Sequence, residues 1–348
     1  MKKQIELVLV QLGKSHAAHL WKNIGYLQQQ WPDLKITLIG DQSITKDRCT
    51  NLGIDYVDYQ PNEIEKQLVL STAHDSNFRK GFWNFSLLRL FAILKYVEEK
   101  DSNVVIHIES DVLLMKNFPF EVFLNLTKPA WLRFNETHDV ASIFAIPNKS
   151  SAEWLRTRFY DLLSEDKHLT DMTMLSKISH RDPQRIELLP IAENEYDPIL
   201  RKSEISKIER LKITELSEKY GGVFDSAPIG MWLLGQDPRN HKGRLRRFIN
   251  LDHSYIQPNQ VEMRSFRNER VITYSKDTPI FDLHVHSKEL KYFTNAKSLS
   301  VSTESSKKFA KAEKFLPLVF LRISLDYFAR RGFRKGIALG IKNLISKN

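Results

Sequence analysis

The sequence predicts an α/β fold, with a mostly parallel sheet flanked by helices and a basic helical tail at the C-terminus. Short apolar runs alternate with helical patterns over residues 1 to about 130, which is typical of βαβ units. The 348 residues suffice for a large core, and 42% hydrophobic and 27% charged residues are ordinary for a globular protein. Residues 307–348 differ from the rest because they are strongly basic.

The predicted elements follow from apolar periodicity and from glycine or proline stops. In the first half they are strand 5–12, helix 16–30, strand 34–39, helix 84–100 and a strand over residues 104–111. In the second half they are strand 141–146, helices 151–163 and 171–178, strand 186–189, a helix from residue 229 to Gly235, and a strand-like stretch over 280–288.

Two acidic residues, Glu109 and Asp111, end the strand that begins at residue 104. Because strand side chains alternate between faces, we expect both carboxylates to point the same way from its C-terminal end. Open α/β sheets bind ligands beyond that end. Paired hard oxygen ligands there suit Mg²⁺ or Mn²⁺, which in turn suit a diphosphate. The alternative is a solvated strand end.

Residues 280–288 carry two histidines with the alternation of a strand, so His284 and His286 share a face. Imidazole suits Mn²⁺ better than Mg²⁺, so a histidine ligand would favour manganese. Lys288 could contact a phosphate as a point charge. The alternatives are two solvated histidines and a surface lysine.

Two further charged residues stand out by their surroundings. Arg89 lies in an apolar part of its helix, where the guanidinium needs water or an anionic partner such as Asp111 or a diphosphate. Asp225 follows a glycine pair and precedes a helix. It either caps that helix or places its carboxylate in the ligand crevice, to accept a hydroxyl proton or to bind a sugar.

Composition and charge indicate compartment and partners. Cys49 is the only cysteine, which excludes a disulfide within the chain and fits a reducing compartment. The first apolar run is too short for a signal peptide or a membrane anchor. Residues 1–306 carry 41 basic and 40 acidic groups, whereas residues 307–348 carry eleven Lys and Arg against two acidic residues.

The predicted organisation is a domain over residues 1–293, a Ser/Thr-rich linker over 294–306 and a basic amphipathic helical tail over 307–348. Basic residues mixed with Phe and Leu favour a segment at a membrane surface. The alternative is a helix packed on the body with a solvated basic face. The basic residues show no nucleic-acid-binding motif, so we do not expect nucleic acid as a partner.

In their order, these motifs resemble the GT-A glycosyltransferases, nucleotide-sugar enzymes with a Rossmann-related sheet and a DXD-type metal motif. Within that group the chain looks most like the bacterial enzymes of surface-polysaccharide biosynthesis. The resemblance is carried by residues 86–92 around Arg89, the Glu109-Ser110-Asp111 motif, residues 224–230 around Asp225, and residues 283–288. The motif departs from the family pattern by having Glu in the first position and Ser in the second.

The resemblance implies that Asp111 and Glu109 hold Mn²⁺ or Mg²⁺ on the donor diphosphate. Asp111 is the expected direct ligand, because the last acid of the motif usually contacts the metal in this family. Glu109 reaches further, so its contact could run through water or the ribose. One of His284 and His286 would be the C-terminal metal ligand.

The same resemblance places other residues around the donor and the acceptor. Arg89 would contact the nucleotide or its phosphates, and Gln11 with Asp41 would lie near the base and ribose. Lys288 would meet a phosphate. Asp225 would lie on the acceptor side, as the general base if the enzyme inverts.

We therefore expect a metal-dependent glycosyltransferase of the hexosyltransferase type, which moves a sugar from a nucleotide-sugar donor to a carbohydrate or lipid-linked glycan acceptor. The expected location is the cytoplasm, peripheral on the inner face of the plasma membrane. One alternative is a sugar-phosphate nucleotidyltransferase, which usually needs a glycine-rich basic loop that Gly13-Lys14-Ser15 matches weakly. The other is a non-enzymatic protein that binds a membrane surface through the tail.

Overall fold

The computed structural model describes residues 4–13, 17–41, 43–76, 78–100, 103–197, 200, 205–234, 237, 261–266, 269–274, 278–288 and 290–293. The predicted linker and basic tail lie outside these residues. Both therefore stay predictions.

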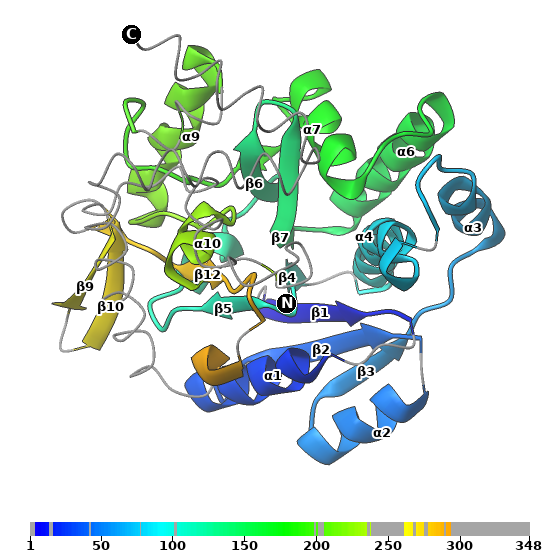
Figure 1. Ribbon diagram of the computed structural model, residues 1–348, viewed down its shortest axis with the longest axis horizontal. Coiled ribbons are helices and arrows are strands. Elements are labelled where there is room, and N and C mark those ends of the chain that lie inside the picture. Colours follow the sequence, from blue (N-terminus) through cyan, green and yellow to red (C-terminus); the bar gives the residue numbers. More distant parts are fainter. Residues whose placement is uncertain are drawn as a thin grey trace, which may run out of the picture.

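A seven-stranded sheet forms the centre of the fold (Figure 1). Its strands are β1 (Gln4–Gln11), β2 (Lys35–Gly40), β3 (Asp55–Asp58), β4 (Asn103–Ile108), β6 (Ala130–Asn135), β7 (His138–Ile146) and β8 (Glu187–Leu188). Their order is β3-β2-β1-β4-β7-β6-β8. All neighbours run parallel except β4 with β7 and β7 with β6, which are antiparallel. The predicted α/β fold with a mostly parallel sheet is confirmed.

Helices cover both faces of this sheet, as Figure 1 shows. The helices α1 (Ala18–Gln30) and α2 (Ser43–Leu52) lie on one face, and α4 (Phe82–Glu99), α6 (Lys149–Glu165) and α7 (Asp171–Arg181) lie on the other. The helix α3 (Glu63–Leu70) packs against α4 and α6. Regular apolar stripes explain why α1, α4, α6 and α7 appear where the sequence predicts them.

The strand β4 is buried on both faces. Val104, Ile106 and Ile108 face the core under α1, whereas Val105 faces the core under α4. None of these four side chains is exposed to solvent. A strand covered by helices on both sides needs such a continuous apolar run.

Smaller elements complete the described part of the chain. They are η1 (Phe78–Lys80), β5 (Val112–Leu114), α5 (Phe120–Leu124), α9 (Lys207–Tyr220), α10 (Pro228–Leu234), β9 (Val261–Phe266), β10 (Glu269–Tyr274), β11 (Thr278–Pro279), β12 (Asp282–His284) and η3 (Leu290–Phe293). The strands β9, β10 and β11 form an antiparallel sheet, and β12 pairs antiparallel with β5. The strand expected over 280–288 is thus limited to β12, because the chain turns after His284.

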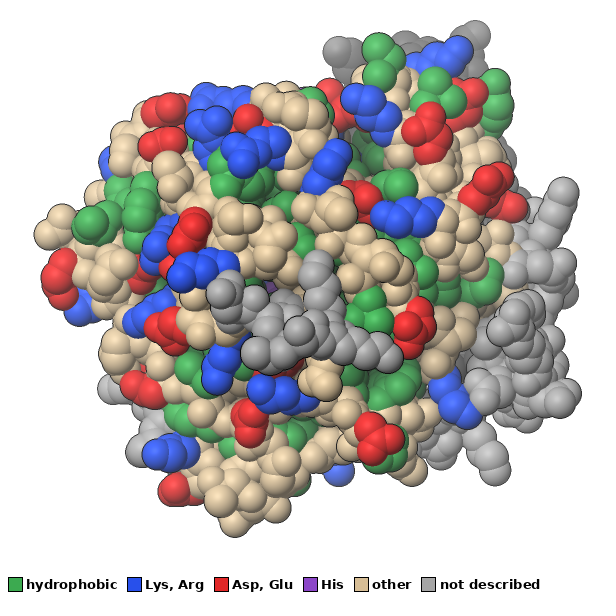
Figure 2. Space-filling model, turned by 180° about the vertical axis from the view of Figure 1, so that it is seen from behind, with side chains coloured by type: hydrophobic (Ala, Val, Ile, Leu, Met, Phe, Trp, Pro, Cys, Tyr) green, Lys and Arg blue, Asp and Glu red, His purple; other side chains and the backbone are tan. Residues whose placement is uncertain are grey.

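Acidic and basic side chains are interspersed over the face seen in Figure 2. Within the described ranges, no helix has the length and apolar character needed to cross a bilayer.

Candidate metal centre

The acidic motif lies in a tight turn between β4 and β5. The backbone N–H of Val112 donates to the carbonyl of Glu109 at 3.0 Å, and the N–H of Glu109 donates to Ser142 on β7 at 3.0 Å. The strand that we expected to reach Asp111 therefore ends at Ile108. The two carboxylates do point toward one site, but a turn directs them there and not strand alternation.

The helix α1 holds this turn in place. The fully buried amide of Asn23 donates to the carbonyl oxygens of Ser110 at 3.2 Å and Val112 at 2.8 Å. His19 Nε2 lies 3.1 Å from the hydroxyl of Ser110. The sequence analysis did not single out either residue, although a polar Asn within an apolar helical stripe is a signal that a buried partner exists.

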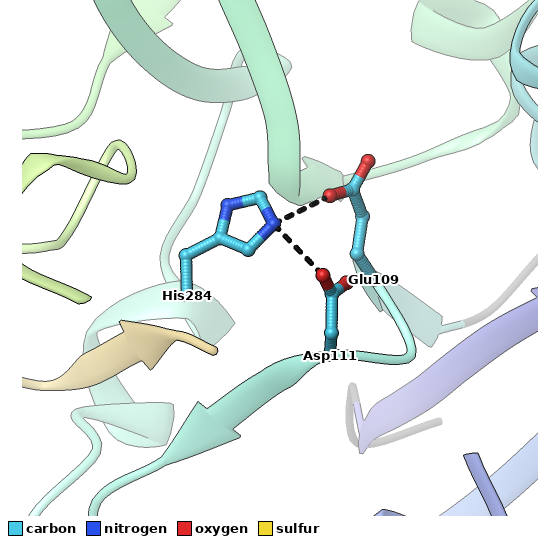
Figure 3. A group of neighbouring side chains, drawn as sticks. All are labelled: Glu109, Asp111 and His284. Atoms are coloured by element: carbon cyan, nitrogen blue, oxygen red, sulfur yellow. Dashed lines mark ion pairs between the residues drawn. The ribbon is translucent and has the colours of Figure 1, made fainter. Parts of the chain in front are cut away.

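The strand β12 brings a histidine to the two carboxylates. His284 pairs with Val112 in the β5–β12 ladder, and the N–H of Val285 donates to the carbonyl of Asp111 at 2.7 Å. This register places His284 Nε2 3.2 Å from Glu109 Oε2 and 3.2 Å from Asp111 Oδ2 (Figure 3). One ligand atom from each of the three residues lies within 4.8 Å of the others.

The second histidine lies beside this group and not within it. The ring of His286 is 4.6 Å from that of His284, measured between centroids. Burial and the neighbouring His284 lower the pKa of His286 to about 3, so it is a neutral imidazole at physiological pH. Of the two predicted histidine ligands, the structure brings His284 to the carboxylates.

Two cationic side chains contact the two carboxylates of the cluster. Arg89 Nη1 donates to Glu109 Oε1, and its Nη2 donates to Asp171 Oδ2 at 3.0 Å. Lys288 Nζ donates to Asp111 Oδ2. The anionic partners of Arg89 are thus Glu109 and Asp171, whereas the sequence had suggested Asp111, a diphosphate or water. Asp171 is a third residue, after Asn23 and His19, that the sequence analysis missed as part of the site.

These contacts set the charge of the site. Burial alone would raise the pKa of Glu109, but Arg89, together with His284 and Lys288, holds that pKa well below its usual value. The pKa of Asp171 is instead raised, because its burial outweighs Arg89 and the Glu109 charge repels its own. Burial lowers the pKa of Lys288 to about 8. A deprotonated Glu109 is therefore available to a cation.

Asp225 lies in the turn before α10, in contact with the backbone of His284, and its side chain is fully buried. Its Oδ1 accepts from the N–H groups of Ala227 and Ile229 at 2.9 Å each. Its Oδ2 accepts from the N–H groups of Gly230 at 2.6 Å and His284 at 3.0 Å. This geometry favours the helix-capping role over the general-base role, because four backbone donors occupy both oxygens, and a base must reach the hydroxyl that it deprotonates.

Gln11 and Asp41, which the family resemblance places near the base and ribose, lie where β1 and β2 end. The carboxylate of Asp41 accepts from the N–H of Gly13 at 3.1 and 3.0 Å, and Gln11 Nε2 donates to Leu12 at 3.3 Å. Gly13 has a φ of +79°, and a Cβ there would lie 2.7 Å from the ring of Phe85. Asp41 therefore stabilises a turn in which the positive φ of residue 13 favours glycine.

The donor set fits a divalent cation. It consists of two carboxylate oxygens and one imidazole nitrogen, a combination that suits Mn²⁺ better than Mg²⁺ or Ca²⁺. Asp111 and His284 are 4% and 6% exposed, so a bound cation would be largely shielded from water.

A second group of potential ligands consists of Glu136, His180 and Glu209, and the last two of these lie next to Arg133. The fully buried guanidinium of Arg133 pairs with Asp139 at 2.5 Å and with Glu209 at 3.0 Å. Because this fixed positive charge already neutralises Glu209, we interpret the group as an ion-pair network that joins β6 to α9.

No protein-family model and no curated protein matches this chain. Among solved structures, it is similar to the galactosyltransferase LgtC in complex with donor and acceptor sugar analogues, with 13% identity and a TM-score of 0.38 over 53% of this chain and 73% of that one. An active-site mutant of LgtC has 13% identity to this chain and a TM-score of 0.38, over 53% of this chain and 72% of that one. The PaToxG glycosyltransferase has 12% identity to this chain and a TM-score of 0.34, over 61% of this chain and 86% of that one. These similarities are too low to assign a family.

Proposed function

We propose that the protein is a metal-dependent glycosyltransferase of the GT-A kind, which moves a sugar from a nucleotide-sugar donor to a carbohydrate or lipid-linked glycan acceptor. The convergence of Glu109, Asp111 and His284 on one point carries this proposal. The three residues come from a turn and a distant strand, yet their ligand atoms lie within 4.8 Å of one another. The turn follows the C-terminal end of β4, where open α/β sheets bind their ligands.

Asp111, Glu109 and His284 would hold Mn²⁺ in this enzyme. The cation would neutralise the charge that develops on the departing nucleoside diphosphate, which is a Lewis-acid role. Lys288 contacts Oδ2 of Asp111, so its ammonium group lies next to the cation site, and it would pair with an anion there once a cation had taken its place on that carboxylate. Arg89 forms an ion pair with Glu109. It would therefore act on the donor in two ways, by orienting the Glu109 carboxylate and by its own positive charge.

Ligand-dependent thermal stability of the full chain tests this proposal. A panel of nucleotide sugars, each with and without Mn²⁺, should raise the melting temperature for the true donor mainly when Mn²⁺ is present. Binding at 100 times the dissociation constant stabilises a fold by about 2.7 kcal/mol. Asp111→Asn should abolish the Mn²⁺-dependent part, whereas Asp166→Asn, which removes a partly exposed carboxylate paired with Lys177, should retain it.

The released product separates this function from the rival one. A glycosyltransferase releases a nucleoside diphosphate from its nucleotide-sugar donor, whereas a sugar-phosphate nucleotidyltransferase releases pyrophosphate from a nucleoside triphosphate. Detection of pyrophosphate would favour the rival. Full sugar transfer by Asp111→Ala would exclude the metal role proposed for Asp111.

We further propose that residues 307–348 hold the enzyme at the inner face of a bacterial plasma membrane, where lipid-linked acceptors of surface-glycan synthesis are presented. The net positive charge of this tail supports the idea, because each Lys or Arg near an anionic surface contributes about 1 kcal/mol. Full-length protein should sediment with anionic liposomes, and residues 1–306 should not. Equal sedimentation of both would refute the anchor.

A further inference from the structure

Asp171 is buried next to the candidate metal centre, although it contributes no ligand atom to it. It is the first residue of α7, directly after the capping residue Thr170, and it is 7% exposed. Its Oδ2 accepts from Nη2 of Arg89 at 3.0 Å, while Nη1 of the same guanidinium donates to Oε1 of Glu109. Arg89 therefore joins Asp171 on α7 to Glu109 beyond β4.

The way in which Arg89 contacts Glu109 determines which oxygen of Glu109 is available. A guanidinium readily pairs with one carboxylate through two parallel hydrogen bonds, which engage both oxygens. Here Asp171 occupies Nη2, and Arg89 contacts Glu109 through Nη1 at Oε1. The other oxygen, Oε2, is the atom that lies 3.2 Å from His284 Nε2 in the cluster.

The charge balance depends on the same contact. With Asp171 in place, the positive charge of Arg89 is shared between two buried carboxylates. Without it, that charge would face Glu109 alone and would oppose a divalent cation at the same carboxylate.

We infer that Asp171 is a positioning residue, which holds Arg89 between two carboxylates and so keeps Glu109 Oε2 directed at the cation site. This inference rests on the proposed function and adds a supporting partner to its metal site. Partners of this kind, which orient a ligand without touching the metal, typically change metal affinity 10- to 100-fold when they are removed.

Mn²⁺ binding to the full chain, measured from the electron paramagnetic resonance signal of free Mn²⁺, tests the inference without an activity assay. Asp171→Asn removes the charge and keeps the shape, and it should weaken Mn²⁺ binding roughly 10-fold or more. Asp171→Glu keeps the carboxylate and should bind Mn²⁺ more tightly than Asp171→Asn. Asp166→Asn, whose carboxylate pairs with Lys177, should bind Mn²⁺ like the unsubstituted chain. Thermal melting of each variant separates loss of binding from loss of fold.

A double-mutant cycle tests whether Asp171 acts through Arg89. In an Arg89→Met background, Asp171→Asn should change Mn²⁺ affinity little, because the connecting side chain is gone. An equal effect of Asp171→Asn in both backgrounds would overturn the inference.

The remaining outcomes distinguish this inference from the proposed function. Unchanged Mn²⁺ affinity in a folded Asp171→Asn protein would overturn the inference and leave the proposed function standing. Absence of Mn²⁺ binding by the unsubstituted chain would overturn the inference together with the metal role. Suppose that the unsubstituted chain binds Mn²⁺ but transfers no sugar, and that Asp171→Asn weakens its Mn²⁺ binding. That result would support the inference and refute the proposed function.

Discussion

His284 contacts Asp111 through its side chain, and the next residue along the chain, Val285, contacts Asp111 through the backbone. His284 Nε2 lies 3.2 Å from Asp111 Oδ2, and the carbonyl of Asp111 accepts from the N–H that follows His284 in the chain, at 2.7 Å. The backbone contact continues the β5–β12 ladder, in which His284 pairs with Val112. A one-residue slip of that ladder would turn His284 away from the carboxylates, because strand side chains alternate between faces.

The two neighbouring histidines should therefore differ in their effect on metal binding. His284→Ala removes the imidazole that faces both carboxylates, and it should weaken Mn²⁺ binding by more than the roughly 10- to 100-fold that loss of a supporting partner causes. His286→Ala is the matched control and should change Mn²⁺ affinity much less. Calorimetric titration of both proteins with Mn²⁺ measures the difference. Equal losses would contradict the assignment of His284 as the ligand.

Substitution of Asp225 should reveal a structural role before a chemical one. Asp225→Asn leaves one oxygen for four backbone donors and turns an NH₂ group toward some of them. Loss of charge-assisted hydrogen bonds in a buried site should lower the free energy of unfolding by about 1–3 kcal/mol. Urea unfolding measures this change, with Asp166→Asn as the control. A variant as stable as the unsubstituted chain but devoid of transfer activity would instead support the general-base role.

Gly230 should be irreplaceable because α10 packs directly on β12. A Cβ at Gly230 would lie 2.2 Å from the carbonyl oxygen of His284 and 2.8 Å from Asp225 Oδ2. Gly230→Ala should therefore move His284, lower the free energy of unfolding by about 1–3 kcal/mol and weaken Mn²⁺ binding.

The matched control for Gly230 is Gly25, a helical glycine whose Cβ would meet nothing within 4 Å. Gly25→Ala should stabilise the chain by roughly 0.5–1 kcal/mol, because alanine loses less conformational freedom in a helix. The same urea unfolding and Mn²⁺ titration apply to both variants. If Gly230→Ala behaves like Gly25→Ala, the packing of α10 against β12 does not position His284.

Much of the sheet and its covering helices could be predicted because their patterns are local. Leu20, Ile24 and Leu27 form a regular stripe on α1, and β4 is a continuous apolar run. The helix α2 escaped prediction because its sequence is mostly polar and lacks a regular apolar stripe, although Cys49 within it is fully buried. Its position is determined by packing on the sheet, which no short window of sequence reveals.

The candidate site was predictable in its acidic and histidine residues but not in what holds them. The spacing of Glu109 and Asp111 is visible in the sequence, and so is the pair of histidines. Asp171 looks like an ordinary residue of a helix N-terminus, where acidic side chains are favoured in any case. Its contact with Arg89 depends on how α4 and α7 pack, and that arrangement is tertiary.

His107 should make the stability of the chain depend on pH. It lies on β4 with no solvent exposure, and its Nδ1 is 3.0 Å from the carbonyl oxygen of Val8. Burial lowers the pKa of His107 from 6.5 to about 3, with a smaller contribution from Arg89. The unfolded chain therefore binds a proton at this residue below pH 6.5 and the folded chain does not, so stability falls as the pH drops toward 3.

The size of this effect follows from the pKa difference. Each pH unit below about 6.5 should cost about 1.4 kcal/mol, so His107 should account for about 2 kcal/mol of the stability lost between pH 7 and pH 5. Urea unfolding at both pH values measures this loss, which should be smaller in His107→Gln by that amount. His168→Gln replaces an exposed histidine and serves as the control. The same pH dependence in His107→Gln and in the unsubstituted chain would show that His107 is protonated alike in the folded and unfolded states.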